Sequence, residues 1–298
     1  MKITLDALRI LDAIDRNGSF GAAATELHKV RTALTYTINK LEQDLDVVLF
    51  DRTGHRAVLT QAGELLLNQG RHLLESAIAL EQRVTHFGEG WEPKLRIAFD
   101  DTVNGERLMK MSAQFFAECK YTELDIRSEI LMGTWDALEK NQVDLAIGVS
   151  QIAPSSPHFA SQILGTLKFV FAVSPNHPLA SAPEPLSSET IAKYQAVIVA
   201  DTGPQETSIN YGILTGQKTF RVSRVKEKVL AQIAGIGVGN IPTTYIEEAL
   251  KSGLLISKQV QKTNRHAYLS TAWRVDKQDG KAMQWLINYL KKHGAELL

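Results

Sequence analysis

The feature that most constrains the fold of this sequence is the segment formed by residues 17–60. Apolar and small residues recur at helical spacing over residues 20–27, break briefly, and resume over residues 31–45. Two short strands, residues 47–50 and 57–59, then flank a turn that carries basic side chains. This order predicts a helix-turn-helix followed by a hairpin, which is how a chain builds a rod for the DNA major groove and a wing beside it.

The second helix of this pair has a polar outer face whose chemistry suits the reading of bases. Arg31 can pair bidentately with guanine, Asn39 can pair with adenine, and threonine methyl groups can touch thymine methyl groups. An ordinary solvated face is the commoner interpretation for an isolated helix, but the alanine-rich helix before it and the wing after it favour DNA reading. The wing arginines and Lys29 would contact phosphates or the minor groove. The predicted DNA-binding residues are Lys29, Arg31, Thr32, Thr35, Tyr36, Asn39, Lys40, Arg52 and Arg56.

The charge of the chain is sorted along this segment. A formal net charge of zero excludes a protein coated in positive charge, but it does not exclude a local basic surface. Residues 28–40 contain Lys29, Arg31 and Lys40 and no acid, whereas residues 41–51 contain four acids and no base. We therefore expect the positive surface to be confined to the second helix of the pair and to the wing.

Residues 61–90 form one long helical pattern that we predict to be a linker and dimerisation helix. Apolar residues recur every seven positions with a second set interleaved, which gives the 3.5-residue period of a coiled-coil seam. A rod about 40 Å long with one apolar stripe favours pairing with a second copy of itself. The alternative is a helix packed on its own domain. The predicted dimerisation residues are Leu66, Leu73, Ala77, Leu80, Val84 and Phe87.

The segments GSFGAAATEL, TALTYTINKLEQDLDVVLFDR and LTQAG follow one another in a single register between residues 18 and 63. Together they resemble the N-terminal signature of the LysR-type transcriptional regulators. The resemblance implies a dimeric or tetrameric regulator that binds double-stranded promoter DNA and responds to a small molecule. Thr35 stands where the family usually has serine, and Arg31 where proline or another neutral residue is frequent, so these positions depart from the family pattern.

From residue 94 the pattern changes to alternating strands and helices, which is typical of an α/β domain with a mainly parallel sheet. The expected strands are residues 95–99, 123–130, 143–149, 169–174, 196–200, 219–222, 236–241 and 268–275. The expected helices are residues 106–120, 135–140, 225–234, 244–251 and 280–293. Two small lobes joined by two crossing strands resemble the effector domain of the same family and the periplasmic binding proteins.

The chain is therefore expected to have three parts. Residues 1–60 would form the winged helix-turn-helix, which is all-α in type, residues 61–90 the linker helix, and residues 91–298 the effector-binding domain. Within that domain, lobe 1 would comprise residues of about 91–166 and 269–298, and lobe 2 residues of about 167–268.

Ligands of open α/β sheets bind beyond the carboxyl ends of the strands, here in the cleft between the lobes. Trp135 could stack on a ligand or pack the hinge face, and Asp201 and Thr202 could contact a ligand or cap a helix. Acids in the cleft suit a ligand rich in N–H donors. The predicted effector-binding residues are Asp100, Asp101, Thr102, Asn104, Glu129, Thr134, Trp135, Asp201 and Thr202.

Other chemical signals are weak. The glycines of residues 234–239 follow a helix and open a strand, which is opposite to a dinucleotide loop, so a tight turn explains them. Cys119 lies in an apolar helix and is expected to be a core thiol. Histidines are scattered without metal-ligand spacing, and no nucleophile motif is present. We expect no cofactor, no metal and no enzymatic activity.

No apolar run approaches the roughly 20 residues needed to span a bilayer, and acids interrupt the N-terminal apolar stretch. A single cysteine gives no sign of an oxidising compartment. We therefore expect a cytoplasmic protein with no membrane partner. The pattern GTWDALE, then DLAIG, then ADT is similar to the subgroup containing a regulator of a bacterial purine transporter, which implies a nucleoside or purine-like effector. The alternative function is a small-molecule-binding or enzymatic α/β protein with an accessory helical domain.

Overall fold

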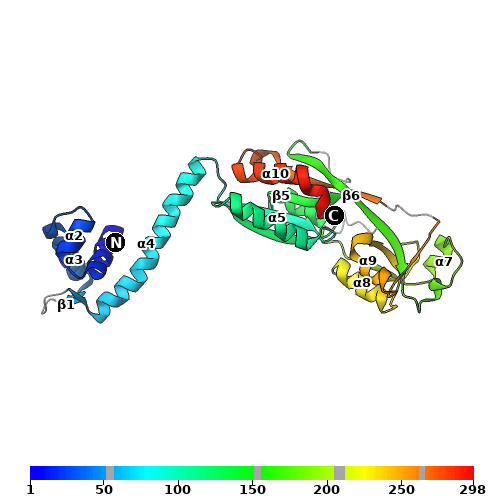
Figure 1. The fold of residues 1–298 in the computed structure, drawn as a ribbon, viewed down its shortest axis with the longest axis horizontal. Helices are drawn as coiled ribbons and strands as arrows, with labels where there is room; N and C mark the ends of the chain where they lie inside the picture. Colours follow the sequence, from blue (N-terminus) through cyan, green and yellow to red (C-terminus); the bar gives the residue numbers. More distant parts are fainter. Residues whose placement is uncertain (52–56, 151–155, 205–211, 262–265) are drawn as a thin grey trace. The chain divides into compact units, whose positions relative to one another are not determined.

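The computed structural model describes residues 1–51, 57–150, 156–204, 212–261 and 266–298 (Figure 1). These residues form two compact units, Met1–Thr85 and His86–Leu298. Within the described ranges, no helix is both long enough and apolar enough to cross a membrane.

The core of the first unit is built by the helices α1 (Leu5–Asn17), α2 (Phe20–Glu26) and α3 (Arg31–Leu45). The hydroxyl groups of Thr4 and Ser19 cap α1 and α2, and Gly18 ends α1 in the left-handed region with a φ of 67°. The small side chain of Ala23 is fully buried, which lets α2 lie close to its neighbours, and Leu34 anchors α3 in the same core. The predicted helix-turn-helix is confirmed.

A short hairpin of β1 (Phe50–Asp51) and β2 (Val58–Leu59) follows α3, with antiparallel pairing. Both strands are shorter than predicted. The carboxylate of Glu42 on α3 accepts the backbone N–H groups of Leu49 and Phe50 at 2.7 and 3.2 Å, which ties the hairpin to α3. Glu42, which the sequence marked only as an acid bordering the basic face, therefore holds the hairpin in place.

The long helix α4 (Gln61–Gly88) begins inside the core of the first unit. Gly70 lies so close to α1 that an added Cβ would be 2.7 Å from a methyl carbon of Leu8. Leu66 is half-buried against the same core, whereas Leu73, Leu80 and other later seam residues are exposed. The first turns of α4 thus pack on their own unit, and the exposed stripe starts after Gly70.

The second unit contains lobe 1, whose sheet has the order β6-β11-β5-β3-β4. β3 (Lys94–Asp100), β4 (Glu123–Glu129) and β5 (Leu145–Ser150) are parallel. β11 (His266–Arg274) is antiparallel to both β5 and β6. Since β6 is antiparallel to β11 in turn, it runs in the same direction as β5, so four of the five strands named share one direction. The sheet is mainly parallel, as predicted, and β11 is the strand that opposes the others.

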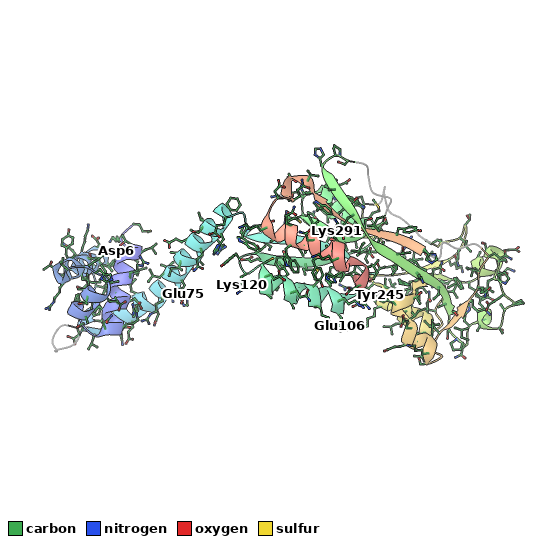
Figure 2. All side chains as sticks on the ribbon, turned by 45° about the horizontal axis from the view of Figure 1, so that its top comes forward. Asp6, Glu75, Glu106, Lys120, Tyr245 and Lys291 are labelled. Atoms are coloured by element: carbon green, nitrogen blue, oxygen red, sulfur yellow. The ribbon has the colours of Figure 1, made fainter. Side chains whose placement is uncertain are left out.

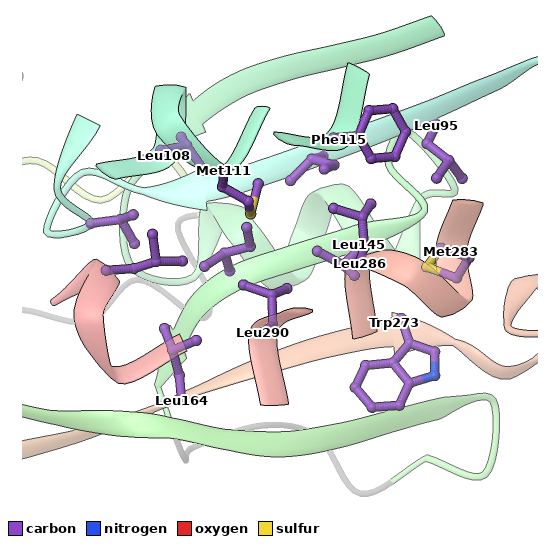
Figure 3. Packing of buried hydrophobic residues seen from close by; sticks show 14 of the residues in the cluster. Leu95, Leu108, Met111, Phe115, Leu145, Leu164, Trp273, Met283, Leu286 and Leu290 are labelled. Carbon is purple, nitrogen blue, oxygen red and sulfur yellow. The ribbon is translucent and has the colours of Figure 1, made fainter. Parts of the chain in front are cut away.

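Lobe 1 buries its sheet on both faces. The helices α5 (Gly105–Glu118) and α10 (Lys281–His293) cover one face, where Phe115 and Leu286 meet Leu145 in the largest apolar cluster (Figure 3). Cys119, directly after α5, is buried in the same cluster. The short helix α6 (Gly133–Glu139) covers the opposite face.

The strand β6 (Phe159–Val173) belongs to both lobes, because its first part pairs with β11 and its last part pairs with β9 and β10 in lobe 2. It starts well before residue 169, where the sequence predicted the strand to begin. In its first half buried and exposed side chains are mixed, so the sequence there lacks the continuous apolar run that marked the second half. The second crossing was predicted at residues 268–275, but β11 pairs only within lobe 1, and residues 262–265 before it lie outside the described residues.

Lobe 2 comprises the strand pair β7 (Ala196–Val199) and β8 (Thr219–Val222), the strands β9 (Gly239–Pro242) and β10 (Ile256–Lys258), and the helices α7 (Ser188–Ala192), α8 (Val225–Ile233) and α9 (Glu247–Lys251). The sequence did not predict α7 or β10. The strand expected from residue 236 begins at Gly239, because the chain turns at Gly235, whose φ is +74°. The helix expected over residues 244–251 is a 3-10 turn followed by α9.

Candidate nucleic-acid interface and interlobe site

The outer face of α3 is open to solvent along its whole length. Arg31, Thr32, Asn39 and Lys40 are exposed, and Tyr36 is 68% exposed despite its large ring. Thr35 is half-buried, and its hydroxyl donates to the Arg31 carbonyl at 3.1 Å. A helix that exposes a tyrosine, an arginine and a lysine while its other face is buried offers a surface suited to contacts with base edges and phosphates.

The basic residues predicted to flank this face are Lys29, before α3, and two arginines of the wing. The Lys29 ammonium pairs with the Asp6 carboxylate on α1 at 2.6 Å, with both side chains well exposed. Such surface pairs are worth about 0–1 kcal/mol, so a DNA phosphate can compete for the lysine. The predicted wing residues Arg52 and Arg56 lie outside the described residues.

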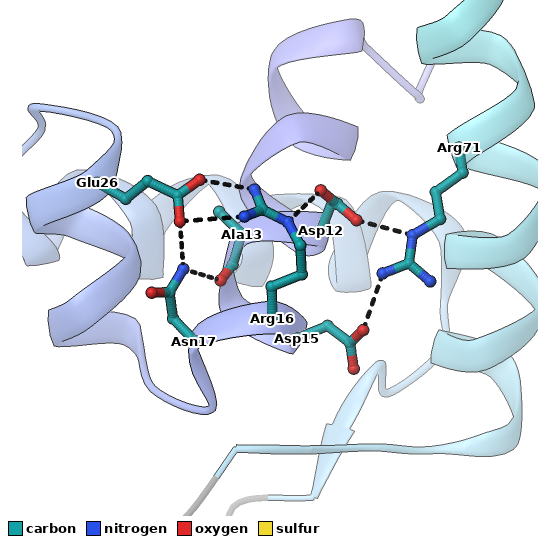
Figure 4. Close-up of polar contacts among 7 residues, drawn as sticks. All are labelled: Asp12, Ala13, Asp15, Arg16, Asn17, Glu26 and Arg71. Carbon is teal, nitrogen blue, oxygen red and sulfur yellow. Dashed lines mark hydrogen bonds and ion pairs between the residues drawn. The ribbon is translucent and has the colours of Figure 1, made fainter.

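A polar network joins the helix-turn-helix to the linker helix within the first unit (Figure 4). Arg16 donates to Asp12 at 2.9 Å and to Glu26 at 2.6 Å, which links α1 to α2. Arg71 on α4 donates to the same Asp12 at 2.8 Å and to Asp15 at 3.0 Å. Burial alone would raise the pKa of Asp12, but hydrogen bonds from Arg16 and Arg71 outweigh it and hold that pKa below its usual value. The network therefore fixes α4 relative to α1. The sequence analysis did not single out these residues.

In the second unit, Asp101 connects the two lobes. Its carboxylate accepts the backbone N–H of Val225, the first residue of α8, at 2.6 Å. Its backbone carbonyl accepts the hydroxyl of Tyr245, which lies where the lobes meet (Figure 2). Burial raises the pKa of Asp101, and burial with the nearby Asp101 and Asp100 raises the pKa of Tyr245 to about 12. Tyr245 was not predicted, since it follows a strand end in a segment read as a helix.

A second interlobe contact joins the ends of β4 and β7. The Thr202 hydroxyl donates to Glu129 at 2.8 Å and accepts the N–H of Ile130 at 2.9 Å. Asp201 accepts the N–H groups of Met132 and Gly203 at 3.1 and 2.8 Å. Four of the predicted effector residues thus lie at the lobe boundary: Asp101, Glu129, Asp201 and Thr202. Their polar groups contact protein groups, and Glu129 also pairs with Arg127 at 3.1 Å.

The remaining predicted effector residues lie deeper or elsewhere. The buried Asp100 carboxylate accepts the N–H and hydroxyl of Thr102 and the N–H of Leu131, and burial raises its pKa. Asn104 caps α5. Thr134 is fully buried, and Trp135 is 3% exposed with its ring edge against Phe159, so packing is the role that this geometry gives the tryptophan.

Several other kinds of chemistry have no support in this geometry. Within the ranges that the structure describes, no group of three His, Cys, Asp or Glu side chains could hold a metal ion. Burial raises the pKa of Cys119 to about 11, which keeps the thiol protonated and unreactive at neutral pH.

A helix-turn-helix with an open second helix, a long linker helix and a two-lobed α/β domain together define a one-chain transcriptional regulator with a ligand-binding domain. Residues 5–64 match the bacterial regulatory helix-turn-helix protein, lysR family, and residues 88–295 match the LysR substrate binding domain. The chain belongs to the LysR-type transcriptional regulators, which are regulators and not enzymes.

Relatives from Escherichia coli K12 support this placement. The chain is 41% identical to the uncharacterized regulator YeeY over 87% of this chain and 84% of that protein. It is 38% identical to the probable regulator YhaJ over 97% and 96%, and 31% identical to the regulator PunR over 95% and 91%. A solved structure of Corynebacterium glutamicum OxyR, a C206 mutant, superimposes with a TM-score of 0.66 at 19% identity, covering 99% of this chain and 95% of that one, which shows the shared fold.

Proposed function

We propose that the protein binds double-stranded promoter DNA as a dimer or tetramer, and that a small molecule bound between the lobes changes how it binds. The observation that carries the DNA-binding half is the open outer face of α3, on which Arg31, Tyr36 and Lys40 are exposed while the inner face is buried. Arg52 and Arg56 would add phosphate contacts, so binding should weaken steeply with salt. Promoter DNA lies in the cytoplasm, which is where we place the protein.

The proposed dimer uses the stripe on α4. Leu73, Leu80 and Val84 are exposed in the single chain, with Ala77 half-buried between them, and Phe87 is also exposed. Exposed apolar side chains at a 3.5-residue period suit a second copy of the same helix. Pairing two helix-turn-helix units lets the protein read two half-sites.

The interlobe contacts supply the proposed response to a ligand. A ligand that binds the open and closed arrangements unequally shifts the balance between them. The similarity to the purine-transporter regulator subgroup supports a nucleoside or purine-like effector. The cleft acids do not add support, because Asp100, Asp101 and Asp201 already accept protein N–H groups. Adenosine, inosine and free bases should raise the unfolding temperature, and the absence of any thermal shift would remove this assignment.

The double substitution Arg31→Ala with Tyr36→Ala tests the DNA-reading surface. Genomic footprinting of the wild type first supplies bound sites as probes. We expect the variant to lose discrimination between a bound site and random duplex, measured by fluorescence anisotropy, while light scattering shows an unchanged oligomer. The matched control is Lys291→Ala with Tyr268→Ala, both exposed in the second unit. Full discrimination by the α3 variant would show that this face does not read DNA.

A further inference from the structure

Lys228 on α8 is a buried cation in lobe 2. Its side chain lies on the same inward face as Val225 and Gln232, and the residue is 9% exposed. The ammonium Nζ lies 3.4 Å from the point that a Cβ on Gly239 would occupy, and the Gln232 amide and the Val197 carbonyl oxygen both lie 3.1 Å from that point. The missing side chain of Gly239, at the start of β9, thus lets three polar groups of α8 and β7 approach the strand closely.

Within the described residues, no hydrogen bond or ion pair of the Lys228 ammonium is present. Among the elements packed against α8, the strands β7 and β9 and the end of β6 at residues 169–173 carry no ionisable side chain. The strand β8 brings another cation, Arg221, and the 3-10 turn after β9 brings Tyr245, so neither of these two elements supplies an acid. The nearest acid on the helix, Glu227, accepts the N–H groups of Ser223 and Arg224. Burial lowers the pKa of Lys228 to about 8, and no neighbouring charge offsets this. A buried charge without a partner is costly, so its presence calls for a compensating role.

Lys228 lies close to the interlobe contact. It is three residues along α8 from Val225, about 5 Å on the helix axis, and the N–H of Val225 donates to Asp101 of lobe 1. The segment after β9 reaches the same residue through the Tyr245 hydroxyl. The helix α8 therefore begins at the lobe boundary, and β9 leads from Gly239 towards it, where a ligand of the proposed regulator would enter.

The acidic side chains at this boundary have hydrogen-bond partners within the protein, whereas the Lys228 ammonium has none in the described part of the chain. Asp100, Asp101 and Asp201 have backbone N–H donors as partners, and Glu129 has the Thr202 hydroxyl. Among the residues that the structure describes, the Lys228 ammonium has no such partner, and a cation calls for an anion from outside the chain. We propose that Lys228 is the anchor of the interlobe site and binds a carboxylate or phosphate group of the effector. This inference rests on the proposed function, because it assumes that the effector binds between the lobes.

The test measures binding of four probes to the full chain by isothermal titration calorimetry: adenosine 5′-monophosphate, adenosine as its neutral match, inorganic phosphate and acetate. We expect at least one anion to bind and to lose at least tenfold in affinity in Lys228→Met. Lys226→Met, on the exposed side of the same helix, is the matched control and should bind as the wild type does. Preference for the monophosphate, for free phosphate or for acetate identifies the source of the anionic group.

Two further readouts separate an anchor from a structural lysine. Above about pH 8, the affinity of the wild type for the anion should fall about tenfold per pH unit, because the lysine loses its proton. The charge of a phosphomonoester no longer changes there, since its second pKa is about 6. Without any anion, Lys228→Met should unfold at a higher temperature than the wild type, because an apolar stem replaces an unpaired buried charge.

The proposal is overturned if none of the three anions binds the wild type better than Lys228→Met, or if Lys228→Met loses stability and anion binding together with its fold. Such results would leave the DNA-binding function intact, because that function is measured on operator DNA with the α3 variant. If Lys228→Met lost operator discrimination in the absence of any ligand, Lys228 would have a role in DNA binding as well, and the proposal that it acts only by binding the effector would be overturned.

Discussion

Lys228 makes the stability of the α/β unit depend on pH. Burial lowers its pKa from 10.5 to about 8. Below pH 8 the lysine is charged in the folded and unfolded states, so the cost of burying the charge is fully present. Between pH 8 and about 10.5 the folded lysine loses its proton while the unfolded one keeps it, so this group raises the free energy of unfolding as pH rises.

We therefore expect the stability difference between Lys228→Met and the wild type to shrink by roughly 3 kcal/mol across this window. Chemical denaturation at a series of pH values measures it, and subtracting the variant's curve removes the titration of other lysines and tyrosines. Lys226→Met should run parallel to the wild type. Parallel curves for Lys228→Met would mean that the buried lysine keeps an ordinary pKa.

At the scale of the element, α4 divides its apolar residues between two tasks. Gly70 and Leu67 pack on the first unit, whereas Leu80 is 60% exposed. The 3.5-residue period is the same in the first turns of α4 and in its later turns. Spacing alone therefore cannot distinguish a residue that packs on α1 from one that is exposed and available to a second chain. What separates them is the close approach of α1, where Leu8 fills the space beside Gly70.

Replacing Leu80 with glutamate should dissociate the proposed dimer, because each copy would place a charge in an apolar seam. We expect sizing with light scattering to show a monomer or a dissociation constant raised by at least tenfold. Ile78→Glu is the matched control, since Ile78 is 46% exposed but lies away from the seam positions. An unchanged oligomer in Leu80→Glu would place the interface elsewhere.

At the scale of the whole molecule, local signals predicted more than long-range ones. Gly18 ends α1 and Ser19 caps α2 as the sequence predicted, and α3 has the bounds that its apolar spacing predicted, because such signals act within a few residues. The rule that ligands bind beyond the carboxyl ends of strands correctly predicted that Asp101, Glu129 and Thr202 lie at the lobe boundary. It could not show that their partners are Val225 and Ile130 of the backbone, because such contacts depend on how two distant segments meet.

The lobe contact itself depends on a glycine. A Cβ on Gly133, the first residue of α6, would lie 1.8 Å from the Thr202 hydroxyl oxygen and 2.9 Å from a Glu129 carboxylate oxygen. Rotation about χ1 can move the threonine hydroxyl, but the Cβ atom of Thr202 would still lie 3.0 Å from the added carbon, so the backbone must shift. Gly133→Ala should therefore force the lobes apart at this point and break the hydrogen bonds from the N–H groups of Ile130 and Met132.

Amide hydrogen exchange followed by mass spectrometry measures this opening. We expect peptides containing Ile130 and Met132 to exchange at least tenfold faster in Gly133→Ala, while those of β3 stay protected. Gly105→Ala is the matched control: Gly105 is also the first residue of a helix, and nothing lies within 4 Å of its added Cβ. Because alanine suits a helix better than glycine, that control should be neutral or slightly stabilised. Unchanged exchange in Gly133→Ala would mean that the lobes meet without the close approach at Thr202, and the proposed coupling of ligand binding to lobe closure would then lack its contact.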